Sequence, residues 1–352
     1  MTAITAVTVQ NIRTHENFSL RLSPNVTVIT GKNGSGKTSL IEAMYIALQG
    51  TSFKGSDNDV LRHNQPWWRI TMKLDDDTTR VIKFDPLRSS GKKQFVIDQK
   101  TSYRLPAKYK YPVVLFEPDD LRLLHGSPTR RRHFIDHFIS QLDSLYAVTL
   151  RKYDRALKQR NNLLKKPDTT PDELFVWDVA LSEYGAYIIE QRVQFIEQIN
   201  SHLNEAYNTI AQSNDVVSIH YSHTVIGTIK QKMLQELHAS SERDKHLGFT
   251  SIGPHRHDVI FRYNNAPALS VASRGEVRSV VLALKFLEVD IIERLTGKKP
   301  IVLLDDVFSE LDESRQAALM KNSLATQLVI ATTNNHQGSE PLGHEVRLSF
   351  DK

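Results

Sequence analysis

Residues 31–38 read Gly-Lys-Asn-Gly-Ser-Gly-Lys-Thr, which matches the phosphate-binding loop pattern G-x-x-x-x-G-K-S/T at every fixed position. A β-branched run, Val26–Thr30, precedes the loop, and an apolar run of helical character, Leu40–Leu48, follows it. The loop therefore lies between a predicted strand and a predicted helix, where backbone N–H groups and the helix N-terminus bind phosphates. A glycine-rich turn with a solvated lysine would leave this arrangement unexplained.

Two residues of the loop carry the expected chemistry. Lys37 would reach the β- and γ-phosphates of a nucleotide, and the hydroxyl of Thr38 would bind Mg²⁺. The predicted nucleotide-binding residues are the loop and the position after it: Gly31, Lys32, Asn33, Gly34, Ser35, Gly36, Lys37, Thr38 and Ser39.

An acidic pair follows a second apolar run, Ile301–Leu304. Asp305 and Asp306 there fit the Walker B pattern, in which a carboxylate at the carboxyl end of a strand holds Mg²⁺. A second carboxylate can orient or deprotonate the attacking water. We therefore predict Thr38 and Asp305 as Mg²⁺ ligands. Lys37 and Asp306 are the predicted catalytic residues of an ATPase.

The composition is that of an ordinary globular chain. It has 352 residues, 40% hydrophobic and 24% charged, which fits two domains or one domain with a large insertion. No apolar run is long enough to span a membrane, and the first residues do not resemble a secretion signal. Cysteine is absent, which excludes disulfides and cysteine-ligated metal sites and is compatible with the cytoplasm. The net charge of +5 allows a nucleic-acid partner without requiring one.

The chain falls into three stretches of different character. Residues 1–117 are rich in predicted strands and contain the phosphate loop, 118–248 are mainly helical, and 249–352 return to an α/β pattern with the acidic pair. The predicted fold class is α/β: a phosphate-loop ATPase domain split in sequence by a helical-hairpin insertion, a lid or arm domain. The predicted strands are Ile4–Val9, Phe18–Leu22, Val26–Thr30, Arg69–Leu74, Thr79–Phe84, Val113–Phe116, Ile301–Leu304 and Leu328–Ala331.

Two long amphipathic helices are predicted in the insertion. Ser127-Pro128 is a helix start, and apolar residues recur from there at helical spacing to Leu157. Thr170-Pro171-Asp172-Glu173 is a capping box, and the apolar run behind it continues to Ile210. The short linker at 165–169 predicts that the two helices form an antiparallel hairpin.

The first of these helices and its turn are strongly basic. A solvated face is the usual role of such a charge run, but cations clustered along one helix are also the footprint of phosphate binding. The sequence leaves both interpretations open, and contact with DNA is the functional one. The cations are Arg130, Arg131, Arg132, Arg151, Lys152, Arg155, Lys158, Arg160, Lys165 and Lys166.

Ser273-Arg274-Gly275-Glu276 is either a plain capping box or the signature motif of ABC-type ATPases, which it resembles. As a signature it would use Ser273 and Gly275 to bind nucleotide, because a capped helix N-terminus with a glycine lets a phosphate approach closely. It lies far from the phosphate loop but shortly before Asp305, as in ABC-type ATPases. Ser309-Glu310-Leu311-Asp312 resembles the D-loop that follows Walker B. This ABC-type order implies a nucleotide held between two subunits, with Ser273 of one facing the γ-phosphate bound by the other.

Over essentially its full length the chain resembles the RecF family of recombination mediators. The motifs that carry the resemblance are Asn11-Ile12-Arg13-Thr14, the phosphate loop, Leu115-Phe116-Glu117-Pro118-Asp119-Asp120-Leu121, Gly126-Ser127-Pro128-Thr129-Arg130-Arg131-Arg132, Gly253-Pro254-His255-Arg256, and Leu303-Leu304-Asp305-Asp306-Val307-Phe308-Ser309-Glu310-Leu311-Asp312. With this resemblance Arg13 becomes a further predicted nucleotide-binding residue.

The resemblance implies a specific activity. Members of the family form a homodimer when ATP is bound, clamp double-stranded DNA at gaps and at junctions with single strands, and hydrolyse ATP slowly to release it. They work with RecR and RecO to promote RecA loading, in DNA repair, replication restart and the SOS response. By this resemblance we expect a cytoplasmic protein that uses ATP and Mg²⁺ as a weak, DNA-dependent ATPase switch. Its expected partners are DNA, a second copy, RecR, RecO and, indirectly, RecA, with no membrane partner.

The chain departs from the expected motifs in three places. His257 stands where the family usually has an acidic residue after its Gly-Pro-His-Arg motif. Val277 replaces the usual glutamine in the signature. Thr332 and Thr333 stand where ABC-type proteins commonly have a switch histidine. These departures concern the rate of hydrolysis rather than nucleotide binding.

His255 and His257 form an i, i+2 pair that would face one way on an extended segment. No cysteine or obvious third ligand accompanies them, and Pro254 indicates a loop. A structural or interface role is therefore predicted, in preference to a metal site.

Two other classes of ATPase share some of these motifs. An SMC-type DNA-tethering ATPase needs long coiled coils, or a cysteine-based zinc hook in one branch. Here the helical insertion is short and cysteine is absent. A transporter ATPase subunit has its signature much closer to the phosphate loop and needs a membrane partner. The SMC-type protein is the stronger alternative of the two.

Overall fold

The computed structural model describes residues 3–88, 91–223, 227–308, 311–323, 326–333 and 344–348. The chain forms two compact units, Met1–Leu121 with Glu288–Lys352, and Arg122–Leu287. The first boundary lies close to the one predicted after residue 117. The second unit extends past the predicted limit at 248, because β9 (Val217–Tyr221) pairs along its length with β10 (Val259–Tyr263).

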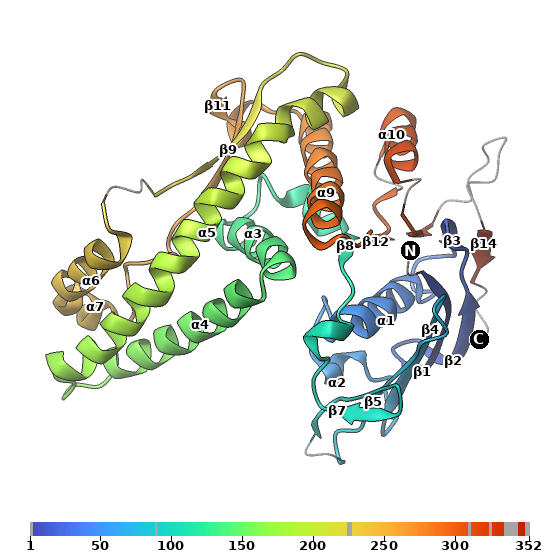
Figure 1. Ribbon diagram of the computed structural model, residues 1–352, viewed down its shortest axis with the longest axis horizontal. Coiled ribbons are helices and arrows are strands. Elements are labelled where there is room, and N and C mark those ends of the chain that lie inside the picture. The colour runs from blue at the N-terminus through green and yellow to red at the C-terminus, as the bar shows by residue number, and fades with distance from the viewer. Residues whose placement is uncertain are drawn as a thin grey trace. The chain divides into compact units, whose positions relative to one another are not determined.

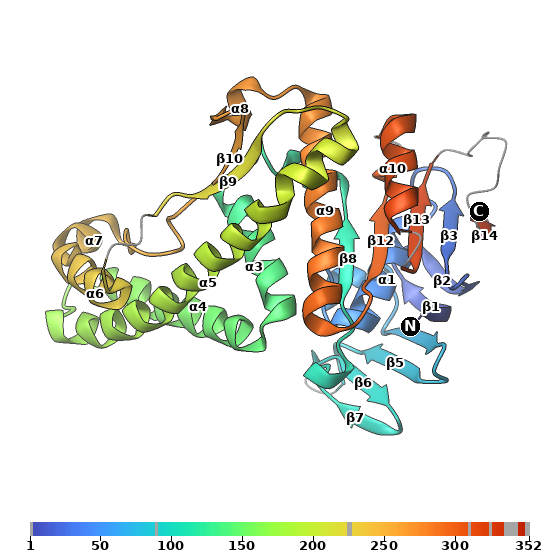
Figure 2. The same cartoon turned by 45° about the horizontal axis from the view of Figure 1, so that its top comes forward.

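A parallel five-stranded sheet is the centre of the first unit (Figure 2). Its strand order is β14-β3-β13-β12-β8. The strands are β3 (Val26–Thr30), β8 (Val113–Phe116), β12 (Ile301–Asp305), β13 (Leu328–Thr332) and β14 (His344–Arg347). The first four are buried at every position, which is why they read as continuous apolar runs. In this sheet β13 and β12, which come late in the sequence, lie between β3 and β8, which come early. Both halves of the sequence therefore build the sheet.

A second sheet of the same unit is antiparallel and has six strands in the order β2-β1-β4-β5-β6-β7. They are β1 (Ile4–Ile12), β2 (His15–Arg21), β4 (Trp68–Leu74), β5 (Thr79–Phe84), β6 (Gln94–Ile97) and β7 (Lys100–Ser102). Buried and exposed residues alternate along β4 and β5, so one face lies in the core. The turn predicted between them is confirmed: Asp77 has φ 61°, and Asp76 accepts a hydrogen bond from the Thr78 backbone.

Helix α1 (Lys37–Gln49) lies between the two sheets and contacts both (Figure 1). Apolar side chains from Leu40 to Leu48 are almost completely buried, since the helix has sheet on two sides. The buried amide of Gln327 also joins the sheets. Its Oε1 accepts from the Ile4 N–H (2.7 Å), and its Nε2 donates to the carbonyls of Ile4 and Ser23 (both 2.8 Å). Two shorter helices complete this unit, α2 (Asp57–Val60) and α10 (Glu313–Ser323).

The second unit is built on α3 (Pro128–Leu142), α4 (Ser144–Leu164) and α5 (Pro171–Ala211). The prediction of one continuous first helix is wrong, because Asp143 ends α3 and caps α4. Its carboxylate accepts hydrogen bonds from the Leu145 backbone (2.8 Å) and the Tyr187 hydroxyl (2.7 Å). The second predicted helix is confirmed as α5, with the predicted capping box in place. In Figure 1, α4 and α5 run side by side as a helical hairpin.

The remaining elements of the second unit were not predicted, apart from the last helix. α6 (Ile229–Ala239) packs on α5, and α7 (Ser241–Leu247) contacts α4 and α6. β9, β10 and β11 (Ala266–Pro267) form a small antiparallel sheet. α8 (Ala268–Val271) leads to α9 (Arg274–Thr296), the helix expected behind the signature motif.

Two buried arginines join the helices of the second unit. Arg160 is 0% exposed and binds Asp178 (2.6 Å) and Asp244 (2.7 Å). Arg192 makes two hydrogen bonds of 2.8 Å to Asp136. Burial raises the pKa of Asp178, and the Arg160 guanidinium opposes that rise. The expectation that Arg160 belongs to a solvent-facing basic surface is therefore wrong.

Candidate functional site

The phosphate loop lies between β3 and α1, as predicted. Gly36 caps α1 with φ 92°, a conformation that favours glycine. A Cβ at this position would also collide with the side chains of Thr14 and His15. The His15 ring nitrogen Nε2 lies 3.0 Å from the Gly36 carbonyl oxygen, and burial lowers the pKa of His15. The turn after β1 thus supports the loop from outside, a role that the motif Asn11-Ile12-Arg13-Thr14 did not by itself indicate.

The side chain of Lys37 lies inside the loop. Its ammonium donates hydrogen bonds to the carbonyl oxygens of Gly31 (2.8 Å) and Lys32 (3.1 Å), and the residue is 6% exposed. The loop is closed by a hydrogen bond from the Ser35 N–H to the Lys32 carbonyl (3.1 Å). The charge that would meet the phosphates is therefore held at the loop by the loop's own backbone.

Thr38 and Asp305 meet as predicted. The Thr38 hydroxyl donates to Asp305 Oδ1 at 2.6 Å, and Asp305 is 2% exposed at the carboxyl end of β12. A hydroxyl and a carboxylate are oxygen donors of the kind that Mg²⁺ takes beside nucleotide phosphates. In the described part of the chain no group of three or more His, Cys, Asp or Glu side chains could hold a metal ion. Ligands from the nucleotide and water would have to complete the coordination.

Lys54 is a member of this site that the sequence did not reveal. Its ammonium lies 3.2 Å from Asp305 Oδ2, on the second oxygen of the carboxylate that Thr38 contacts. The backbone N–H of Lys54 donates to the Ser52 hydroxyl (2.9 Å), which in turn donates to Glu42. Lys54 lies in a short irregular segment after α1, where no motif marks it.

Asp306 follows β12 directly and has φ 55°. Its backbone N–H donates to the Ala331 carbonyl of the neighbouring strand β13 (2.9 Å). The backbone of Asp306, the predicted catalytic residue, is thus fixed next to Asp305. It lies at the carboxyl ends of the parallel strands, where the phosphate loop also begins. Thr332, which stands near the position of the usual switch histidine, is 1% exposed at the end of β13.

Arg13, the other predicted nucleotide ligand of the first unit, is held by an ion pair. Its Nε and Nη2 donate to the two oxygens of Glu42 (2.6 and 3.0 Å). Glu42 is fully buried one turn into α1, and the hydrogen bond from Arg13 to it raises the pKa of Arg13. The Arg13 side chain is 31% exposed, so it can also meet a ligand.

The signature motif of the second unit begins α9. Ser273 and Glu276 form a reciprocal capping box: the Ser273 N–H donates to Glu276 Oε2 (2.6 Å), and the Glu276 N–H donates to Ser273 Oγ (3.3 Å). The first of these bonds lowers the pKa of Glu276. Ser273 and Arg274 are exposed and Gly275 is partly exposed. The motif is thus a capped helix start open to a ligand. Of the predicted D-loop, Ser309 and Glu310 lie outside the described residues.

Eight of the ten predicted DNA-contacting cations fall into two groups; of the other two, Arg160 is buried and Arg130 is partly exposed at the start of α3. Arg131 makes a two-pronged ion pair with Asp258 (2.9 and 2.7 Å), and Arg132 donates to the His257 carbonyl (2.7 Å), so both hold the loop before β10. The other group is exposed on α4 and the turn behind it: Arg151, Lys152, Arg155, Lys158, Lys165 and Lys166.

His255 and His257 have structural contacts. A ring nitrogen of His255 lies 2.6 Å from the Tyr153 hydroxyl, and one of His257 lies 2.9 Å from the Tyr221 hydroxyl. The ring of His257 also stacks on that of His223. Burial lowers the pKa of His255 to about 4 and that of His257 to about 3, so both rings are neutral at pH 7.

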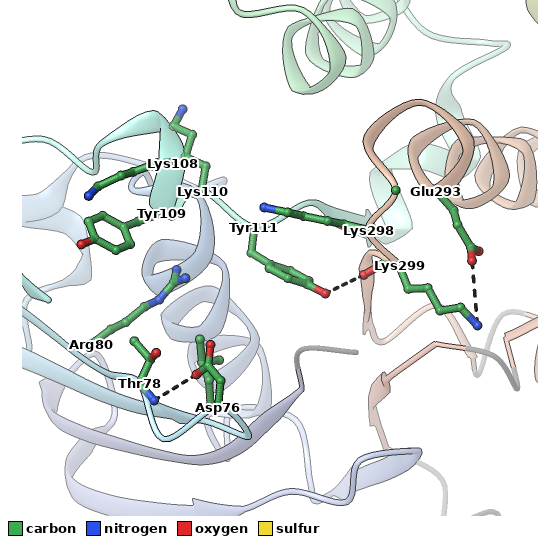
Figure 3. A pocket seen from close by; sticks show the side chains of 12 residues that line it. Asp76, Thr78, Arg80, Lys108, Tyr109, Lys110, Tyr111, Glu293, Lys298 and Lys299 are labelled. Atoms are coloured by element: carbon green, nitrogen blue, oxygen red, sulfur yellow. Dashed lines mark hydrogen bonds and ion pairs between the residues drawn. The ribbon is translucent and has the colours of Figure 1, made fainter. Parts of the chain in front are cut away.

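A basic pocket of about 480 Å³ lies in the first unit at the end of α1 opposite the phosphate loop (Figure 3). Its cations are Arg80, Lys108, Lys110, Lys298 and Lys299. Arg80 donates to the Ala47 carbonyl in the last turn of α1 (3.1 Å). Lys298 and Lys299 follow the end of α9. Because helix C-termini carry partial negative charge, this contact gives Arg80 a structural role.

Known proteins share both sequence and fold with this chain. A family model described as an AAA domain matches residues 6–205. A DNA replication and repair protein RecF of Clostridium perfringens (strain SM101 / Type A) is 36% identical over 330 residues, which are 92% of this chain and 91% of that protein. The RecF protein of Streptococcus agalactiae serotype V is 32% identical, over 97% of this chain and 94% of that protein.

Solved structures agree with these relatives. The recombination mediator protein RecF-ATP in the RecFOR pathway has a TM-score of 0.85 at 28% identity, over 96% of this chain and 94% of that one. An Smc head domain derived from Pyrococcus furiosus has a TM-score of 0.51 at 16% identity and shares the fold alone.

The phosphate loop, the Walker B pair and the split parallel sheet define an ABC-type phosphate-loop ATPase fold. No helix in the described ranges is both long and apolar enough to cross a membrane. Within the ABC-type class, the family is decided by the relatives that match this chain over 92% and 97% of its length. The chain belongs to the RecF family of DNA replication and repair proteins.

Proposed function

We propose that this protein is an ATP-dependent, DNA-binding recombination mediator. The observation that carries the proposal is the hydrogen bond of 2.6 Å between Thr38 and Asp305, beside a loop that already holds Lys37. Thr38 and Asp305 would hold Mg²⁺, which neutralises phosphate charge when bound. Lys37 would bind the β- and γ-phosphates. Asp306 would orient or deprotonate the attacking water.

The proposed active form is a homodimer with ATP between the subunits. Ser273 and Gly275 start α9 as an exposed, capped N-terminus, which can receive a phosphate through backbone N–H groups. In the dimer this terminus would meet the γ-phosphate held by the phosphate loop of the other subunit. ATP then joins the subunits, and slow hydrolysis releases them and the DNA.

Replacing Ser273 with arginine is expected to abolish the ATP-dependent dimer while each monomer still binds ATP. The new side chain brings bulk and charge to the helix start, and the phosphate loop is unchanged. Thr170→Arg is the matched control, because it breaks the same kind of capping box at the start of α5. Sedimentation with and without ATP checks both variants. An ATP-dependent dimer of Ser273→Arg would refute the shared nucleotide site.

The proposed substrate of this clamp is double-stranded DNA at gaps and at junctions with single strands. Relatives named as DNA replication and repair proteins, and a structural neighbour named as a mediator of the RecFOR pathway, support this role. The proposed partners are RecR and RecO, and through them RecA, in replication restart and the SOS response in the cytoplasm. Pull-down with RecR separates this proposal from an SMC-type tethering ATPase, which would retain a kleisin instead.

The exposed cations of α4 are the proposed duplex contacts. Arg151, Lys152 and Arg155 lie within five residues of one another and have no carboxylate partner among the described residues. Arg131 and Arg132, by contrast, are used by the loop at His257 and Asp258. Charge neutralisation can therefore test α4 without loosening the fold.

Neutralising Arg151, Lys152 and Arg155 to glutamine is expected to weaken duplex binding and to flatten its salt dependence. The slope of log affinity against log salt should shrink by roughly 0.9 for each duplex phosphate that the variant no longer binds. Fluorescence anisotropy with gapped duplex and ATP measures the slope. Neutralising Lys230, Lys232 and Arg243, which are exposed on α6 and α7, removes the same charge elsewhere in the unit. An equal slope for the α4 variant and the wild type would exclude α4 as a DNA surface.

A further inference from the structure

The six-stranded sheet has one face that the core does not cover. The pairing register places the outward residues in rows across five strands, with Gln10 beside Arg69, and Arg69 beside Lys83. Inward neighbours such as Ile70 and Ile82 are buried, while Lys83 is exposed and Arg69 partly exposed. The outward residues, here called the outer face, are Asn17, Ser19, Arg21, Ala6, Thr8, Gln10, Arg69, Thr71, Lys73, Thr79, Val81, Lys83, Gln94 and Val96.

The outer face has cations and no carboxylate. Arg69 and Lys83 stand directly opposite each other on β4 and β5, and Arg21 and Lys73 lie on the same face. Like charges at directly opposite positions destabilise a sheet. None of these four side chains has an ion-pair partner in the described ranges, and Arg69 Nε is buried there without a hydrogen-bond partner. The unbalanced charge is suited to an anionic partner.

A groove of about 770 Å³ continues the outer face at the start of β4 and the end of β5. Besides Arg69 and Lys83 it has Arg88 and Lys92, and one carboxylate, Asp85. That carboxylate is already used, since it lies 3.5 Å from Arg88 and accepts a hydrogen bond from the Leu87 backbone. The groove therefore keeps an excess of positive charge.

Two adjacent tryptophans of this groove have different roles. Trp68 is fully buried, stacks on Phe84 and donates its indole N–H to the Asp57 carbonyl (2.9 Å). Trp67 is 39% exposed beside Arg69. An exposed aromatic ring next to cations is the arrangement on which proteins stack the bases of single-stranded nucleic acid while binding its phosphates. A duplex, whose bases are already stacked, would not use the ring in this way.

We propose that the outer face and its groove bind a single-stranded segment of DNA, with Arg69 and Lys83 on phosphates and Trp67 stacked on a base. This inference rests on the proposed DNA binding and adds a second contact, in the ATPase unit, for the strand next to the duplex. An acidic protein is the other class of partner that such charge could meet. Trp67 favours nucleic acid, because it offers a stacking surface at the place where the cations converge.

The test uses the full-length protein with ATP and an oligothymidine probe. The double variant Arg69→Gln/Lys83→Gln should bind oligothymidine at least fivefold more weakly, and its salt slope should shrink by roughly 0.7 for each single-strand phosphate that it no longer binds. The indole fluorescence of wild-type protein should be quenched by the probe. Trp67→Phe should abolish most of that quenching, because Trp67 is the tryptophan proposed to stack on a base. Trp68 and Trp177 stay in the variant and supply its remaining fluorescence.

Lys108→Gln/Lys298→Gln is the matched control, because it removes two charges from the pocket of Figure 3 in the same unit. Equal affinity, slope and quenching in the wild type and the outer-face variants would overturn the proposal and leave the face to an acidic protein. The proposal would also be overturned if the control variant lost as much affinity for oligothymidine as the outer-face variant. It would likewise be overturned if the outer-face variant lost as much affinity for blunt duplex as for oligothymidine. If wild-type protein bound no DNA with ATP, the proposed function itself would fail.

Discussion

Replacing Lys37 with alanine is expected to lower the affinity for ATP at least tenfold, which corresponds to about 1.4 kcal/mol. The Lys37 ammonium is nearly buried and is held by two loop carbonyls, so the substitution removes a charge that the loop backbone itself positions. Isothermal titration with ATP and Mg²⁺ measures the affinity. A change of less than threefold would show that Lys37 does not bind the phosphates.

Asp306→Asn is the contrasting variant for the same measurement. It should keep ATP affinity within threefold and keep the dimer, while turnover falls, because the amide cannot take a proton from water. Asparagine also tolerates the φ of 55° at this position, so the backbone next to Asp305 is preserved. Equal turnover in Asp306→Asn and the wild type would show that another residue takes the proton from the attacking water.

Replacing Arg160 with methionine is expected to destabilise the protein by about 3–5 kcal/mol, the usual cost of removing one partner from a buried ion pair. The substitution leaves Asp178 and Asp244 buried without their cation, and Thr250 loses the hydrogen bond that it accepts from the same guanidinium. Four helices, α4 to α7, meet at this side chain or its partners. Urea unfolding measures the destabilisation, and Arg155→Met, at an exposed site on α4, should stay within about 0.5 kcal/mol of the wild type.

The destabilisation by Arg160→Met should be smaller at about pH 5 than at about pH 8. Burial already raises the pKa of Asp178, and removal of the guanidinium that opposes this would raise it further. A carboxyl whose pKa is raised by folding adds stability below its unfolded pKa and loses it as pH rises through its folded pKa. The folded variant thus recovers stability by taking up a proton at low pH. An effect independent of pH would show that the missing packing outweighs the missing charge.

Much of the first unit could be predicted from the sequence, because its strands are buried on both faces or on one. Val26–Thr30, Thr79–Phe84 and Val113–Phe116 have the predicted bounds. The contact of Thr38 with Asp305 could be predicted across most of the chain because both residues belong to motifs that are expected to share one chemical task, the binding of Mg²⁺. Local patterning and motif chemistry are the two signals that sufficed.

The charged residues were harder to place, because an ion pair depends on a partner that local sequence does not show. Arg131 and Arg160 look like solvent-facing members of a basic helix, but their partners Asp258 and Asp244 are far along the chain. Lys54 contacts Asp305 from a segment without periodicity or motif. The break at Asp143 depends partly on the Tyr187 hydroxyl, a tertiary contact. Such contacts form only once the helices are packed.

Synthesis on the ribosome meets the parallel sheet in an unfavourable order. β3 and β8 emerge early, but β12 and β13, which lie between them in the sheet, follow only after the whole second unit. Domains generally fold as units during synthesis. Here the second unit is the first that can complete its core, while the N-terminal segment waits for its central strands. A chain that stops after the second unit would therefore have a phosphate loop without Asp305, the carboxylate that Thr38 contacts, so the two parts of the candidate site come together only after the second unit has been made.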